Sequence, residues 1–114
     1  MLNLSSTSHI VRIITAAAAN VDCHASWVDL SGTTVTPGSL NTTSIVTATT
    51  TTVVPAPAAS TVRNVKALYI TNTSASASSR VTVEHFDGTS PAELIGFILL
   101  PGENMTFNEE GRWN

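Results

Sequence analysis

The clearest pattern in the chain is an alternation of apolar and polar residues that begins at Val21. Small or apolar residues occupy every second position, at Val21, Cys23, Ala25 and Trp27. The positions between them carry polar side chains. A period of two is typical of a β-strand that buries one face and exposes the other. The pattern therefore predicts a half-buried strand from Val21 to Leu30.

Further strands are predicted along the rest of the chain. The runs that are rich in β-branched residues or alternate in polarity are 9–15, 64–73, 80–86, 92–100 and a last piece around Met105 and Phe107. Residues 43–54 fit two short strands or one bent strand. Turns are expected at Ser31-Gly32 and at Pro37-Gly38. We expect the second half of the chain to be a meander, with 92–100 as a central strand.

Turn signals recur about every ten residues, which is the spacing of β-sandwiches and barrels. We therefore expect an all-β fold, a single-domain antiparallel β-sandwich or barrel-like meander over residues 9–114. Residues 1–8 are expected to be a flexible N-terminal arm. The proline-rich connector at 55–60 lies within the domain, because about 55 residues on either side are marginal for independent folding. The predicted core residues are Val21, Cys23, Trp27, Leu68, Ile70, Val81, Val83 and Phe97.

The composition indicates a surface with little charge. Charged residues make up 11% of the chain, against about 25% in ordinary soluble domains. Ser and Thr fill the difference, with 31 residues between them. Such a surface suits a protein packed in an assembly, because an isolated monomer needs more charge for solubility. The basic residues are scattered, which argues against nucleic-acid binding, and no apolar run is long enough to span a membrane.

The residue types that carry chemistry form no recognisable site in the sequence. Asp22 and His24 have a spacing that metal ligands use, but no second ligand cluster accompanies them. Ser and Thr are so abundant that one lying near His85 indicates no catalytic pairing. No glycine-rich nucleotide-binding motif is present. We therefore expect no catalytic residues, no metal and no cofactor, and a buried, unreactive Cys23.

The two ends of the chain supply the candidate interface residues. Met1, Leu2 and Leu4 lie in the expected arm, and such a segment can become ordered on a neighbouring subunit. Arg112 and Trp113 lie near the C-terminus, and both residue types are enriched in protein interfaces. For Trp113 the sequence is equally compatible with a core position and an interface position.

Several strand and turn patterns point to a known class of proteins. They are HASWVDL (24–30), GTTVTPG (32–38), PAAST (57–61), RNVK (63–66), VTVEH (81–85), DGT (87–89) and LPGE (100–103). These stretches resemble small β-rich virion structural proteins of tailed bacteriophages, and the resemblance covers most of the chain from about residue 9 to the end. The resemblance implies a virion component of the capsid decoration or cement type.

On this basis we expect a non-enzymatic virion protein that binds the outer surface of the major capsid protein shell. It would be assembled in the host bacterial cytoplasm and act as a homo-oligomer, with a trimer preferred. Its partners would be the major capsid protein or other virion proteins. The alternatives are a structural role in the tail, the head–tail junction or a fibre base, and a carbohydrate-binding module used in adsorption. An enzyme is the least supported alternative.

Overall fold

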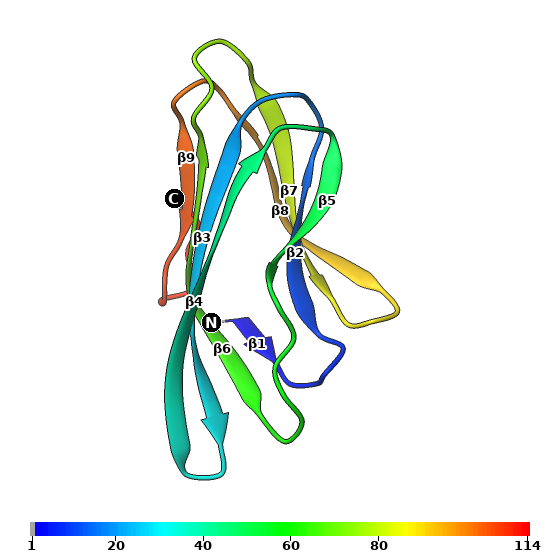
Figure 1. Ribbon diagram of the computed structural model, residues 1–114, viewed down its shortest axis with the longest axis vertical. Helices are drawn as coiled ribbons and strands as arrows, with labels where there is room; N and C mark the ends of the chain where they lie inside the picture. Colours follow the sequence, from blue (N-terminus) through cyan, green and yellow to red (C-terminus); the bar gives the residue numbers. More distant parts are fainter. Residues whose placement is uncertain (1) are drawn as a thin grey trace.

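Within residues 2–114, which the computed structural model describes, the chain forms nine β-strands in two antiparallel sheets (Figure 1). The strands are β1 (Leu2–Leu4), β2 (Ile10–Thr15), β3 (Val21–Ser31), β4 (Thr34–Ile45), β5 (Thr49–Val54), β6 (Val62–Asn72), β7 (Ser79–Phe86), β8 (Pro91–Leu99) and β9 (Asn104–Phe107). Sheet A has the order β1-β6-β3-β4, with β9 also paired to β6. Sheet B has the order β5-β2-β7-β8. The expected all-β sandwich is confirmed.

The two sheets pack through the side chains that alternate along each strand. In β3, Val21, Cys23 and Ala25 are buried, and in β2 Val11 and Ile13 are fully buried. Burial of each such aliphatic side chain contributes about 1.5–3 kcal/mol. Among the predicted core residues, the buried ones are Val21, Cys23, Trp27, Leu68, Ile70, Val81 and Val83. Phe97 is half-buried, because its strand β8 lies at the edge of sheet B.

The β3–β4 hairpin is longer than the sequence predicts. Gly32 makes the expected turn with φ 60°, a conformation that glycine adopts at low cost in tight hairpins. The second predicted turn is wrong, since Pro37 and Gly38 lie inside β4 opposite Val28 and Trp27. Proline is tolerated there because β4 is an edge strand, which can lack one N–H on its open side. The hairpin extends past sheet B at the lower end of Figure 1.

The second half of the chain is not the predicted meander. β6 belongs to sheet A, β7 and β8 belong to sheet B, and β9 returns to sheet A. Residues 92–100, predicted as a central strand, form most of the edge strand β8, in which Ile98 is 60% exposed. An apolar run indicates a strand but not its position in the sheet, and this is why the prediction failed.

The predicted flexible arm is also corrected. Leu2–Leu4 form β1, which pairs with Arg63–Val65 of β6. The side chain of Leu4 is fully buried in the core, and Leu2 packs against the core. His85, which belongs to sheet B, also contacts β1, because its Nε2 lies 3.1 Å from the carbonyl oxygen of Asn3. Met1 lies outside the described residues.

Asn72, at the end of β6, is a fully buried polar side chain. Its Nδ2 donates hydrogen bonds to the carbonyl oxygens of Ala77, at 2.7 Å, and Leu99, at 3.1 Å. Its Oδ1 accepts a hydrogen bond from the backbone N–H of Ser74 at 3.0 Å. Because its donors and acceptor are paired, the buried amide carries little desolvation penalty. The side chain thereby ties β6 in sheet A to the end of β8 in sheet B.

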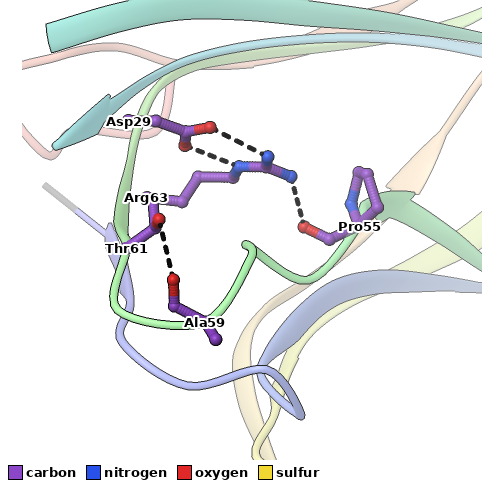
Figure 2. A network of polar contacts seen from close by, with 5 residues as sticks. All are labelled: Asp29, Pro55, Ala59, Thr61 and Arg63. Carbon is purple, nitrogen blue, oxygen red and sulfur yellow. Dashed lines mark hydrogen bonds and ion pairs between the residues drawn. The ribbon is translucent and has the colours of Figure 1, made fainter. Parts of the chain in front are cut away.

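A polar network supports sheet A where the hairpin leaves the sandwich (Figure 2). The Arg63 guanidinium donates from Nε to Asp29 at 2.8 Å and from Nη2 to the other Asp29 oxygen at 3.0 Å. Its Nη1 donates to the carbonyl oxygen of Pro55 at 2.7 Å. The guanidinium also stacks on the Trp27 ring, with 4.5 Å between its central carbon and the ring centre. The bidentate pair links β3 to β6. The bond to Pro55 adds the start of the 55–60 connector, which crosses from sheet B to sheet A.

Candidate functional site

The outer face of sheet A is apolar near the tip of the β3–β4 hairpin. Residues paired across neighbouring antiparallel strands share a face. The pairing places Leu30 between Val35 of β4 and Val62 of β6, and Val28 beside Pro37 in the next row. Val35 is 62% exposed and Leu30 is 42% exposed. We call these five residues the hairpin patch. Contiguous exposed apolar residues of this kind are typical of contact sites.

The sequence carried a signal for the hairpin patch that the prediction missed. Up to Trp27, the apolar residues of β3 occupy the odd-numbered positions, which face inward. After Trp27 they occupy the even-numbered positions, with Val28 and Leu30 on either side of the acidic Asp29. The reversal places apolar side chains on the outer face and the Asp29 carboxylate on the inner face, against Arg63. Because Pro37-Gly38 was predicted to be a turn, the pairing of Pro37 with Val28 was not predicted.

Farther along the same face the surface is polar, with Tyr69 at its centre. Tyr69 pairs with His24 of β3 on one side and Thr106 of β9 on the other, and it is 49% exposed. Two hollows adjoin it, with volumes of about 310 Å³ and about 240 Å³. The first is lined by Ser26, Lys66, Ala67, Tyr69, Asn108 and Glu109, and the second by Asp22, Cys23, His24, Asn41, Thr43, Tyr69 and Thr71. We call Tyr69 and these two hollows the Tyr69 site.

Polar side chains of the second hollow are held in fixed positions. His24 lies beside Asn41, and Nδ1 of its ring donates a hydrogen bond to Oδ1 of Asn41, since that oxygen can only accept. The rings of His24 and Tyr69 lie 6.1 Å apart. Asp22 accepts a hydrogen bond at 2.8 Å from the backbone N–H of Ser44, which has φ 59°. Asp22 and His24 are therefore each hydrogen-bonded to a residue of β4.

Of the predicted interface residues that the structure describes, none lines either surface, although the backbone N–H of Arg112 donates a hydrogen bond to Asn108, which lines the first hollow. Trp113 bridges to Phe107 of β9, with 4.9 Å between their ring centres, and packs against the core. Arg112 is exposed, with its Nε 4.0 Å from a carboxylate oxygen of Glu110. Leu4 is buried within the protein and is therefore not available to a partner. β1, which holds Leu4, and β9, to which Trp113 bridges, both lie on the edge of sheet A opposite β4.

Two titratable groups have pKa values shifted by their surroundings. Burial raises the pKa of the Cys23 thiol to about 12, so the thiol is neutral and unreactive near neutral pH. The pKa of Asp87 is lowered, chiefly by hydrogen bonds from the backbone N–H groups of Ser90 and Thr89. The first shift belongs to the core and the second to the β7–β8 turn, so neither indicates a reaction site.

Residues 2–114 contain no group of three or more His, Cys, Asp and Glu side chains that could hold a metal ion. They also contain no helix that is long and apolar enough to cross a membrane. No family model, no curated protein and no solved structure matches the chain. The two surfaces of sheet A are therefore the features from which a function is argued.

Proposed function

We propose that the protein is a non-enzymatic virion structural protein of a tailed bacteriophage, and that it decorates the capsid by seating its hairpin patch on the major capsid protein. The observation that carries the proposal is the hairpin patch itself. It places Leu30 and Val35 on an exposed face at the projecting end of the molecule. An apolar patch at an extremity is well placed to enter a depression on a larger surface.

The residues that carry the resemblance to phage virion proteins support this choice of partner. The stretches 24–30 and 32–38 fold into the β3–β4 hairpin, and they include four of the five residues of the hairpin patch. The fifth, Val62, lies beside Leu30 on β6, directly before the stretch 63–66. Four of the five residues of the exposed apolar surface thus lie in two of the seven stretches that carry the resemblance.

The hairpin patch should also dock at a low cost in free energy. The Arg63 network fixes β3, β6 and the connector to one another, so the patch loses little conformational freedom when it docks. The patch holds no charged side chain that would need a buried counter-ion. We further propose that the protein acts as a homo-oligomer, preferably a trimer, because several patches that bind together retain the protein more strongly than one.

The test uses virus particles prepared without this protein. Purified wild type is added back, and the bound amount is measured relative to the major capsid protein. Decoration predicts saturation at a copy number comparable with that of the major capsid protein. Saturation at a small number of copies at one vertex or on the tail would contradict decoration and favour a head–tail junction or tail position.

A pair of variants connects the result to the hairpin patch. The double variant Leu30→Ser with Val35→Ser should lose binding to particles and keep the melting temperature of the wild type. Ile98→Ser is the matched control, because Ile98 is 60% exposed on sheet B, close to the 62% of Val35. Normal binding by the double variant would contradict the role of the patch, as would loss of binding in the Ile98 control.

A further inference from the structure

We propose that the Tyr69 site binds a saccharide, as a function separate from attachment through the hairpin patch. Tyr69 is the single tyrosine of the chain, and it stands half-exposed in the polar part of the outer face of sheet A. Isolated exposed aromatic rings are ordinary on protein surfaces. Tyr69 differs because it lines two separate hollows.

The size of the hollows indicates a small ligand unit in each. The first, of about 310 Å³, lies at the lower end of the range of about 300–1,000 Å³ that ligand sites occupy, and the second, of about 240 Å³, lies just below that range. Each is suited to a unit of the size of one sugar ring. Because Tyr69 lines both hollows, the arrangement favours two linked sugar rings. One of them would pack the face that carries its C–H groups against the tyrosine ring.

The chemistry of the lining selects a neutral polyhydroxyl compound. The first hollow offers the hydroxyl of Ser26 and the Nδ2 of Asn108, whose Oδ1 already accepts hydrogen bonds from the backbone N–H groups of Glu110 and Arg112. Its Lys66 and Glu109 carry opposite charges. The second offers the hydroxyls of Thr43 and Thr71 and the groups of the His24–Asn41 pair. Hydroxyl, amide and carboxylate groups pair with both the donors and the acceptors of sugar hydroxyls. The opposite charges provide no net attraction for an anion such as a phosphate.

The same composition argues against a protein partner at this site. The buried centre of a protein–protein interface is rich in apolar side chains. The Tyr69 site offers the rings of Tyr69 and His24 among mostly polar side chains, whereas the hairpin patch is wholly apolar. The two surfaces on sheet A therefore suit different partners.

The test follows the NMR signals of the Tyr69 ring, which are unambiguous because the chain has one tyrosine. Purified protein is titrated with neutral disaccharides and trisaccharides built from glucose, galactose and N-acetylglucosamine. We expect saturable shifts of the Tyr69 ring and of the His24 and Lys66 signals with at least one of them. Tyr69→Ala should weaken that binding about tenfold or more. Tyr69→Phe keeps the ring face and should retain most of it.

Matched variants separate this inference from the proposed attachment to capsids. The double variant Leu30→Ser with Val35→Ser should bind the saccharide normally, and Tyr69→Ala should bind particles normally. The melting temperature of each variant shows whether it is folded. Three results would overturn the inference: no saturable shift at Tyr69 with any saccharide of the panel, saccharide binding that survives in folded Tyr69→Ala, or loss of particle binding in folded Tyr69→Ala.

Discussion

Sheet A has opposite polarity at its two ends. In the part covered by sheet B, the inner face is apolar, with Cys23 and Leu68 buried, and the outer face is polar around Tyr69. In the projecting part, the inner face carries the ion pair of Asp29 and Arg63, and the outer face carries the hairpin patch. Trp27 lies at the boundary, with Arg63 stacked on its ring.

The difference shows how one strand can serve two purposes. Alternation of apolar and polar residues specifies which face of a strand is buried, and a one-residue change of phase moves the apolar set to the other face. In the covered part the apolar face meets the second sheet of the same chain. In the projecting part it faces outward, which is the arrangement expected if another molecule completes the burial. The predictions below test whether the two parts differ in this way.

The largest effect is expected at the boundary. Trp27→Ala should lower the free energy of unfolding by about 3–5 kcal/mol, because it leaves a cavity and removes the surface on which Arg63 stacks. Leu68→Ala, a core change in the covered part, is the comparison and should cost about 2–5 kcal/mol. Both values are measured by urea unfolding. An unchanged midpoint in Trp27→Ala would show that the ring does not contribute to the core.

A smaller effect is expected in the polar network of the projecting part. Asp29→Asn should cost about 1–3 kcal/mol, because it leaves the largely buried Arg63 without its counter-charge. Hydrogen exchange should increase in the 55–60 connector, to which Arg63 also bonds. The control is Glu84→Gln, which removes the charge from the single 2.8 Å contact between Arg12 and Glu84 on sheet B. It should cost less because that pair has one hydrogen bond where Asp29 and Arg63 have two. Equal losses in the two variants would contradict a special role for the network.

The burial of Cys23 in the covered part should make the stability of the protein depend on pH. The pKa of Cys23 is raised from 9.0 to about 12 in the folded state. The folded protein therefore favours the neutral thiol, and this contribution is complete below pH 9 and is lost as the pH rises toward 12. Near pH 10 the loss should be about 1 kcal/mol. The free energy of unfolding is measured from unfolding curves at a series of pH values, and Cys23→Ala should lack this loss at high pH. Parallel pH profiles for the variant and the wild type would contradict the prediction.

The smallest effect on stability is expected in the hairpin patch. The Leu30→Ser and Val35→Ser double variant should change the free energy of unfolding by no more than about 0.5 kcal/mol, because both side chains are exposed in the single chain. Its effect should be visible only in binding to particles. A loss of several kcal/mol would show that these side chains already pack within the protein, and the contrast between the two parts would disappear.

Local features of the fold were predictable from the sequence. The alternation from Val21 to Trp27 identified a strand and its buried face, and Gly32 identified the hairpin turn. The connector at 55–60 was recognised from its prolines. Each of these features depends on neighbours in the sequence, for which period, turn chemistry and proline geometry are direct physical signals.

Features that depend on strand pairing were not predictable. Pro37-Gly38 has the composition of a turn, but in an edge strand the missing N–H costs nothing. The Tyr69 site joins side chains from three strands and the segment after β9, and no short stretch of sequence contains its pattern. The sequence prediction placed the interface at the chain ends, where the structure instead shows Leu4 in the core and Trp113 packed against Phe107.

Gly38 has a consequence for recognising relatives of this protein. It lies in β4 opposite Trp27, and a Cβ atom at position 38 would come within 2.5 Å of the indole Nε1. Any side chain there would displace the ring and, with it, the surface on which Arg63 stacks. Positions 27 and 38 are therefore constrained to evolve together. Among divergent sequences, a tryptophan followed eleven positions later by a glycine across a tight turn should identify chains that share this hairpin, even where little else is conserved.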